Sequence, residues 1–599
     1  MKKRSAVLAV VLLAALAGTG AGSLRRSLAK PISVVFADKV SEFQWTLGEL
    51  AGPGPGLPAD WSEYGFLVLE LRTSSTQRFS LWIHTAAGKR RIMFHPFGLN
   101  VWMRAAVPLQ YFQGRDARGT DLASTNNRRT DTFYIGVWGP FGPLTDVRAI
   151  GVEMDYPIGR PGLEIRSAAL AREDPGSAFL EETPVVDEFG QWARTDWPRK
   201  IHSREELARE LAEEEKALEA AAAEFKVGRY GGDLDTQAKA TGFFRVEMIE
   251  GRWWLVDPEG RLFLSTGANG VSGGRSGENA DLSLRRMAAW GMNTIGNWSS
   301  LRPTEEKDRR AYATMFRPPR SEPSFLGMPD VYSEEFARAV EQAAEKMCAP
   351  LKDDPWLLGY FLGNEPPWPR RESELVDMFL GGPDGATKAA LMAYLAGGDT
   401  PARRADFIAG MFDRYLAMVG EAIRKADPNH LNLGIRFGGM PEERILRMGR
   451  SFDVFSLNVY EYEPTRQLRR IFDVTGKPVL IGEFHFGVPA GGLGAGLVQC
   501  ADQTERAKGY RFYMEQAAAL PCFVGAHWFQ WSDQPVLGRM DGENYNIGFV
   551  DVTGRAYAEL VAAARLTHKR LGAVHAGKVP PFSERPKASA HGTPASPWD

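Results

Sequence analysis

The chain has 599 residues, with 72 Lys and Arg residues against 74 Asp and Glu residues and a formal net charge of −2. This balance argues against a dedicated nucleic-acid-binding protein, whose binding domain would be basic, and the 44% hydrophobic content excludes a wholly disordered chain. Only three cysteines are present, which excludes a disulfide framework and favours buried free thiols.

The first 30 residues have the pattern of a secretory signal. Lys2, Lys3 and Arg4 form a basic start, and an apolar run from 6 to 17 follows. That run is shorter than the roughly 20 residues that a transmembrane helix needs. The sequence therefore predicts a secreted or periplasmic protein, with no stable membrane insertion after signal cleavage. An uncleaved N-terminal anchor is the alternative.

Residues 31–180 have the pattern of an all-β sandwich of the kind found in carbohydrate-binding modules. Short runs rich in branched and aromatic residues alternate with turns that contain Pro, Gly and Asn. These runs are 32–36, 66–71, 79–84, 132–138 and 149–154. A purely structural role for this domain is the alternative. Trp82, Trp102 and Trp138 are candidates for core packing or for sugar platforms, and core packing is favoured.

A helical linker is predicted between the sandwich and the rest of the chain, over residues 181–238. Ser203 and Glu206 form a capping box at the start of a helix that extends to about residue 226. Its apolar stripe is narrow and its other faces are charged, so the helix is expected on the surface.

Residues 239–576 alternate between strands and helices, which predicts a parallel sheet. The predicted strands are 262–266, 293–297, 313–316, 357–362, 431–436, 454–458, 478–481 and 523–529. Helices are expected at 282–290, 333–347, 405–425, 441–448, 465–471, 504–519 and 556–569. Eight repeats favour a closed (β/α)₈ TIM barrel over an open sheet, and no GxGxxG motif opens the first unit. The tail 577–599 is predicted to be disordered.

Two carboxylates stand at the ends of predicted strands, where barrel enzymes carry their catalytic groups. Glu365 follows the fourth strand and Glu483 ends the seventh, so the two can meet across the mouth of a barrel. A pair of this kind suits glycoside hydrolysis, in which one carboxyl protonates the leaving oxygen and the other stabilises or attacks the anomeric carbon. Other polar and aromatic residues at these ends are Asn297, Trp298, Asn364, Arg436, Asn458, Tyr460, His485, Trp528 and Trp531.

Five stretches of the chain resemble the β-agarases of glycoside hydrolase family 50, within clan A of the retaining glycoside hydrolases. They are 251–267 (GRWWLVDPEGRLFLSTG), 359–368 (GYFLGNEPPW), 482–487 (GEFHFG), 527–534 (HWFQWSDQ) and 538–549 (GRMDGENYNIGF). The resemblance covers about 240–570. It implies that Glu365 is the general acid/base and that Glu483 is the nucleophile of a double displacement with retention of configuration.

The resemblance also implies roles for the surrounding residues. Asn364 is expected to bind the sugar 2-hydroxyl, Tyr460 to donate to Glu483, and Trp528 or Trp531 to stack under the sugar. The remaining substrate-binding candidates are Asn297, Trp298, His485, Asn458 and Arg436. No cofactor and no metal are expected, because His485 and His527 lack a third ligand.

The sequence thus predicts a secreted retaining glycoside hydrolase that cleaves β-galactosidic linkages in agar-like polysaccharide or its oligosaccharides. Two alternatives remain open. One keeps the clan and changes the substrate, giving an exo-β-galactosidase or another polysaccharide hydrolase. The other is a non-catalytic carbohydrate-binding protein on a barrel. The expected partner is a polysaccharide or oligosaccharide, and nucleic acid is not expected.

Overall fold

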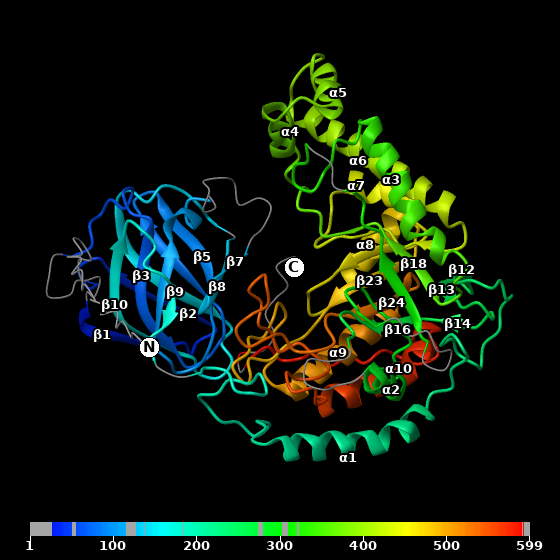
Figure 1. Ribbon diagram of the computed structural model, residues 1–599, viewed down its shortest axis with the longest axis horizontal. Coiled ribbons are helices and arrows are strands. Elements are labelled where there is room, and N and C mark those ends of the chain that lie inside the picture. Colours follow the sequence, from blue (N-terminus) through cyan, green and yellow to red (C-terminus); the bar gives the residue numbers. More distant parts are fainter. Residues whose placement is uncertain are drawn as a thin grey trace, which may run out of the picture.

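The computed structural model describes residues 27–50, 56–114, 127–137, 139–181, 184–272, 280–301, 309–319, 323–589 and 591. These residues form an N-terminal all-β region, followed by a mixed α/β region around a parallel sheet (Figure 1). The predicted signal lies outside the described residues up to position 26, and β1 (Ser27–Val35) begins before its predicted end.

Two antiparallel sheets make the all-β region. One has the order β1, β10 (Gly162–Ala171), β3 (Phe66–Thr73), β6 (Met103–Pro108) and β11 (Ala178–Phe179). The other has the order β2 (Val40–Thr46), β9 (Val147–Asp155), β4 (Phe79–Thr85), β5 (Gly88–Pro96), β8 (Phe133–Gly136) and β7 (Asn127–Arg129). Apolar side chains of both sheets, such as Leu69 and Ile83, pack into one buried core. The all-β prediction is confirmed.

Neither of the two candidate tryptophans that the structure describes, Trp82 and Trp102, offers a bare platform. Trp82 is 1% exposed. Trp102 is covered by two guanidinium groups, those of Arg72 at 4.9 Å and Arg166 at 4.3 Å from its ring centre. Trp138 lies outside the described residues.

The predicted linker helix is α1 (Arg204–Ala222), and it lies along the outside of the molecule (Figure 1). The Ser203 hydroxyl accepts from the Glu206 amide at 3.1 Å, and the Glu206 carboxylate accepts from the His202 amide at 2.8 Å. The second contact is displaced by one residue from the usual capping box. A hairpin of β12 (Arg245–Ile249), β13 (Arg252–Val256) and β14 (Leu262–Phe263) follows.

A curled sheet of eight parallel strands occupies the C-terminal region. Its order is β20 (Leu431–Asn432), β18 (Leu357–Phe361), β17 (Ala311–Met315), β16 (Thr294–Ile295), β15 (Ser265–Ala268), β24 (Phe523–Trp528), β23 (Val479–Phe484) and β22 (Phe455–Asn458). Every residue of β18, β23 and β24 is buried, as expected for parallel strands covered on both faces.

The two edge strands of this sheet approach each other through a short second ladder. Beyond β20, the chain forms β21 (Ile435–Arg436), which pairs with β19 (Gly363–Asn364), the continuation of β18. Phe437 then makes a parallel bridge with Leu457 of β22. All eight predicted strands therefore have counterparts, and the sequence order of neighbours is kept around the sheet.

Helices cover the outer face of the sheet (Figure 1). They are α2 (Ala280–Trp290), α3 (Glu334–Met347), α6 (Pro401–Ala426), α7 (Glu443–Met448), α8 (Thr465–Thr475), α9 (Gln503–Ala518) and α10 (Ala558–His575). Two helices that the sequence did not predict, α4 (Glu372–Gly381) and α5 (Ala386–Leu395), project between β19 and α6. Short 3₁₀ turns occupy Leu109–Tyr111, Ala349–Leu351 and Gly449–Ser451.

The C-terminal segment differs from the predicted disordered tail. Residues 577–589 lie along α9, where the Phe582 amide donates to Glu515 at 2.9 Å and the Lys587 amide donates to Glu505 at 2.7 Å. The guanidinium of Arg511 lies 4.2 Å from the Phe582 ring centre. Composition alone does not reveal these partners, because they sit on a helix about 70 residues earlier in the chain.

Cys348, Cys500 and Cys522 are all buried and free, as predicted. Among the helices that the structure describes, none combines the length and the hydrophobicity that crossing a bilayer requires.

Candidate active site

Asn458 links the two predicted catalytic carboxylates. It ends β22, directly beside Glu483 in the ladder with β23. Its side-chain amide donates to Glu365 Oε1 at 2.8 Å and to Asn364 Oδ1 at 3.2 Å. The structure therefore brings Glu365, Glu483 and Asn364 to one edge of the sheet, as the sequence predicts.

Three donors surround the Glu483 carboxylate, which is 5% exposed. The Arg436 guanidinium and the Trp298 indole N–H, at 2.9 Å, both donate to Oε1. The Tyr460 hydroxyl donates to Oε2 at 2.5 Å, as the sequence predicts. Both oxygens thus have fixed partners, which orients the carboxylate within the site.

Glu365 is chemically distinct from Glu483. Its side chain is exposed to solvent, but its carboxyl group is held against Asn458, which donates to Oε1 at 2.8 Å. Two causes raise the pKa of Glu365 to about 7. The larger is the loss of hydration on burial, and the second is the negative charge of Glu483. A carboxyl with this pKa holds a proton near neutral pH and can give it to a leaving group.

Arg436 and Tyr460 both donate hydrogen bonds to the Glu483 carboxylate. Arg436 is fully buried between the rings of Trp298 and Phe361, at 5.5 and 5.3 Å from their centres. Burial, and then the charge of Glu483, raise the pKa of Tyr460 well above its usual value, so its phenol stays a donor. Asn458 is 2% exposed. Tyr460 thus makes the positioning contact that the resemblance implies, whereas Arg436 and Asn458, predicted as sugar contacts, are buried against the two carboxylates.

Two side chains of the site stand on strained backbone. Glu365 has a φ of 43° and Trp298 a φ of 63°, in the left-handed region that residues other than glycine avoid. Each conformation costs about 1–3 kcal/mol and persists only where its surroundings enforce it. Trp298 is also 44% exposed, so it is the predicted aromatic group that solvent and ligands can reach.

Glycines permit the close approach of these groups. A Cβ atom at Gly438 would lie 2.9 Å from Cγ of Glu365, and one at Gly482 would lie 2.7 Å from Nε of Arg436 and from Oδ1 of Asn458. Neither glycine has a positive φ, so space rather than backbone conformation requires them.

Three of the predicted sugar contacts lie in the core instead. The Nδ1 atom of His485 is 3.0 Å from the Phe529 carbonyl, and Nε2 accepts from the Leu497 amide at 2.8 Å. Burial lowers the pKa of His485 to about 3, so the ring is neutral. Trp528 and Trp531 are both fully buried. These three predictions are corrected, because all three side chains are buried in the core.

Asn297 is buried, but one polar group of its side chain has no partner among the described residues. It is 3% exposed, and among the described residues its amide nitrogen has no hydrogen-bond partner. Its backbone carbonyl oxygen accepts from the Gly270 amide at 2.8 Å. The unpartnered donor sits next to Trp298 in the chain, so Asn297 keeps its predicted role as a candidate sugar contact.

Sequence reasoning missed a charged pair behind the site. Glu543 accepts from Arg539 at 2.7 Å in the loop after β24. The charge of Glu543 contributes to the raised pKa of both Glu365 and Tyr460. The resemblance includes this loop, 538–549, and the loop is expected at the substrate cleft, but its sequence does not reveal the ion pair.

The all-β region supports the same loop from outside. The hydroxyl groups of Tyr134 and Tyr545 are 2.5 Å apart, and Arg129 donates to the Leu537 carbonyl at 2.8 Å. Phe97 and Phe529 belong to the apolar cluster beneath this contact. The N-terminal region is thus packed directly against the loop that carries Glu543.

Within the described ranges, no group of three or more His, Cys, Asp or Glu side chains is arranged to hold a metal ion. His527 is fully buried, and its Nε2 atom lies 2.8 Å from the Ser265 hydroxyl.

Two curated proteins from Vibrio sp. (strain JT0107) are similar in sequence to the chain. Beta-agarase B is 28% identical, with a match that covers 64% of this chain and 54% of that protein. Beta-agarase A is 27% identical, with 65% and 52% covered. The chain thus matches about half the length of these relatives. No protein-family model matches the chain.

Several solved structures share the fold. PfGH50B has a TM-score of 0.62 at 24% identity, covering 91% of this chain and 97% of its own. The agarase AgWH50C has a TM-score of 0.62 at 23% identity, with 90% and 94% covered. A structure described as an exo-beta-agarase has a TM-score of 0.61 at 23% identity, with 90% and 93% covered.

Proposed function

We propose that the protein is an exported retaining glycoside hydrolase that cleaves β-galactosidic linkages in agar-like polysaccharide or its oligosaccharides. The observation that carries this proposal is the placement of Glu365 and Glu483 around Asn458, with Glu365 poised to hold a proton and Glu483 held by three donors. Relatives named β-agarases support the substrate.

In the first chemical step, Glu365 gives its proton to the glycosidic oxygen while Glu483 attacks the anomeric carbon. The carbon–oxygen bond breaks, the first product leaves, and a glycosyl ester of Glu483 forms. In the second step, Glu365 removes a proton from water, whose oxygen displaces Glu483 from the same carbon. Two inversions give net retention and require carboxyl groups about 5–5.5 Å apart.

The same proposal extends to the architecture. We propose that residues 239–576 form a closed (β/α)₈ catalytic barrel, with the bridge from Phe437 to Leu457 joining its edges. Residues 31–180 would be a separate sandwich domain that follows a cleaved signal of up to 30 residues, and 181–238 would link the two units. Asn364, Asn297 and Trp298 would contact the sugar.

The pH profile tests the role of Glu365. Because Glu365 must carry a proton to act as an acid, kcat/KM is expected to fall as pH rises through about 7, the pKa of this group. Removing the charge of Glu543 lowers that pKa, so Glu543→Gln moves the alkaline limb to lower pH. Initial rates measured across a pH series give the alkaline limb of the wild type and that of the Glu543→Gln protein. An alkaline limb that stays flat beyond pH of about 9 would count against this assignment.

A pair of neighbouring glycines tests the placement of Glu365. Gly438→Ala pushes a methyl group against the Glu365 side chain, so we expect kcat to fall by about 10²-fold, the typical effect of a 1 Å displacement. Thermal unfolding should change little, because the side chain can move. Gly439→Ala is the matched control, because a Cβ there meets nothing within 4 Å. Equal activity of the two variants would contradict the placement.

The substrate is tested by product analysis. The mature protein is incubated with agarose, neoagaro-oligosaccharides and a panel of other β-galactosides, and the products are separated by chromatography. Release of neoagaro-oligosaccharides supports the proposal. Hydrolysis of another glycoside alone would keep the mechanism and change the substrate.

A further inference from the structure

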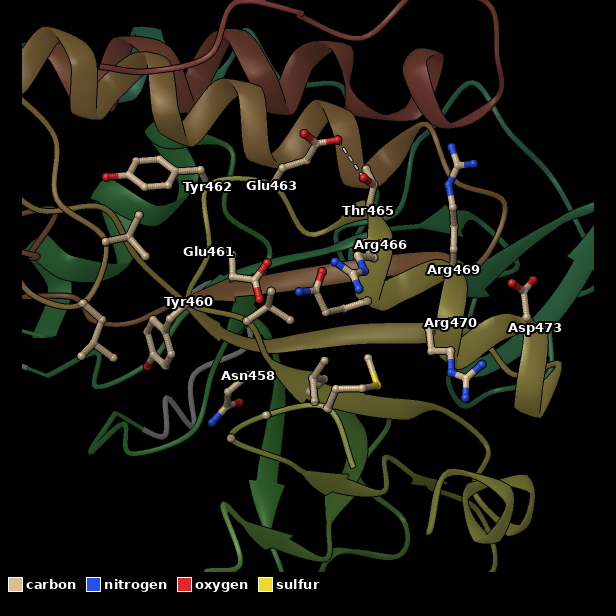
Figure 2. A pocket seen from close by; sticks show the side chains of 18 of the residues that line it. Asn458, Tyr460, Glu461, Tyr462, Glu463, Thr465, Arg466, Arg469, Arg470 and Asp473 are labelled. Atoms are coloured by element: carbon tan, nitrogen blue, oxygen red, sulfur yellow. Dashed lines mark hydrogen bonds between the residues drawn. The ribbon is translucent and has the colours of Figure 1, made fainter. Parts of the chain in front are cut away.

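A large cavity begins beside the candidate catalytic pair and continues along α8 (Figure 2). Its volume is about 1090 Å³. Asn458 and Tyr460, which contact Glu365 and Glu483, line one part of it, and Asp473 near the end of α8 lines another. Pockets for small ligands have volumes of about 300–1,000 Å³, so this cavity has room for sugar units beyond the cleavage point. We call it the α8 groove.

The α8 groove carries an excess of positive charge. Five arginines and three carboxylates line it. Arg585 is paired with Glu463 and Arg470 with Glu443. Arg466 and Arg469 lie on the same helix (Figure 2) and are exposed. Among the residues that the structure describes, neither forms an ion pair with a carboxylate. Two guanidinium groups are therefore left for a ligand.

Polar groups in the wall of the groove also lack partners. Gln467 is 7% exposed and lines the groove, and among the described residues its amide oxygen has no hydrogen-bond partner. The helix α8 begins beside it without a side-chain cap and without an acidic residue in its first turn. A buried amide without a partner costs free energy unless a ligand or water satisfies it. The free N–H groups of a helix start add positive potential.

We propose that the α8 groove binds a galactan segment that carries anionic substituents. Arg466 and Arg469 would contact a sulfate ester or a carboxylate, which match the planar donor fork of arginine. The inference rests on the proposed function, because the anion would belong to the same chain whose linkage Glu365 and Glu483 cleave. It narrows the substrate class from neutral agarose towards charged galactans.

The test compares the Arg466→Gln/Arg469→Gln protein with the wild type on three substrates. These are neutral neoagaro-oligosaccharides, galactan oligosaccharides with 6-O-sulfate esters, and galactan oligosaccharides with carboxylate substituents. We expect the wild type to prefer an anionic substrate. The variant should lose about tenfold of this preference through a higher KM for the anionic substrates, because its charge-assisted hydrogen bonds to the anion are lost. Added salt should reduce the preference of the wild type by screening. Comparing the two anionic substrates distinguishes sulfate from carboxylate.

The matched control is Arg209→Gln/Arg424→Gln, which removes two positive charges from exposed sites on α1 and α6. This control should keep the preference of the wild type. Equal preference in the wild type and the groove variant would overturn the inference, as would an equal rise in KM on all three substrates.

A binding measurement separates this inference from the proposed function. In affinity electrophoresis through a gel that contains sulfated galactan, the wild type should be retarded and the groove variant should not. If the wild type hydrolyses none of the substrates but shows this difference, the proposed function fails and the groove remains an anion site. If the wild type hydrolyses neutral oligosaccharides and both proteins migrate alike, the proposed function stands and the groove proposal is wrong.

Discussion

Substituting Glu483 with glutamine is expected to lower kcat by about 10⁴-fold or more, as the loss of a covalent nucleophile does in other enzymes. The amide cannot attack the anomeric carbon, but it has nearly the shape of the carboxylate. Its oxygen can still accept from Arg436 and Trp298, and its nitrogen can donate to the Tyr460 hydroxyl, which can accept as well as donate. Sugar binding should therefore survive.

Calorimetry with neoagaro-oligosaccharides and rates from reducing-sugar release measure these two effects on the same protein. Glu421→Gln, on the exposed part of α6, is the control for removing one carboxylate. A Glu483→Gln protein that retains a tenth or more of wild-type kcat would exclude Glu483 as the nucleophile, since about 10⁴-fold is expected. Loss of binding together with loss of rate would instead indicate a disturbed fold.

Replacing Glu365 with alanine should produce a different pattern. General acid catalysis contributes about 10²–10⁴-fold, so hydrolysis of neoagaro-oligosaccharides should fall by about that factor. A substrate with a dinitrophenolate leaving group needs no proton, so its first chemical step should keep most of its rate. The second step then lacks its base, and the glycosyl enzyme should accumulate as a burst of dinitrophenolate.

An added anionic nucleophile completes this experiment. Azide needs no general base, so it should restore turnover of the dinitrophenyl substrate by the Glu365→Ala protein and yield a glycosyl azide of β configuration. The Glu483→Gln protein provides the comparison, because it should show neither the burst nor the β-azide. Equal losses on both leaving groups would show that Glu365 does not act as the acid.

The proximity of Glu365 and Glu483 could be predicted from the sequence because it depends on where the two residues fall at the ends of strands. Glu365 and Glu483 follow runs that read as buried strands, and the ends of parallel strands meet at one edge of a sheet. Tyr460 could be predicted in the same way, and its hydroxyl does contact Glu483.

The orientation of side chains could not be predicted. His485, Trp528 and Trp531 also lie at or beyond strand ends, but the chain turns there and directs them into the core. The ion pair of Glu543 and Arg539 was missed because these residues do not lie at the end of a strand. They belong to a loop that returns over the site, supported by the contact between Tyr134 and Tyr545.

The fold was predictable where hydrophobic periodicity controls it. The eight parallel strands and most of their helices follow this pattern. The helices α4 and α5 lie in an insertion after β19, where apolar residues are frequent but are spread around each helix and do not form one stripe. Strands such as β5 were missed because charged residues on the exposed face interrupt the apolar run.

The configuration of the first product tests the central claim most directly. Neoagaro-oligosaccharides are incubated with the full chain, and the anomeric protons of the product are followed by NMR before mutarotation. The account predicts that the β anomer appears first, and that the Glu483→Gln protein releases no product. Early release of the α anomer would contradict the double displacement at Glu483, and the absence of hydrolysis by the wild type would contradict the assignment as an agarase.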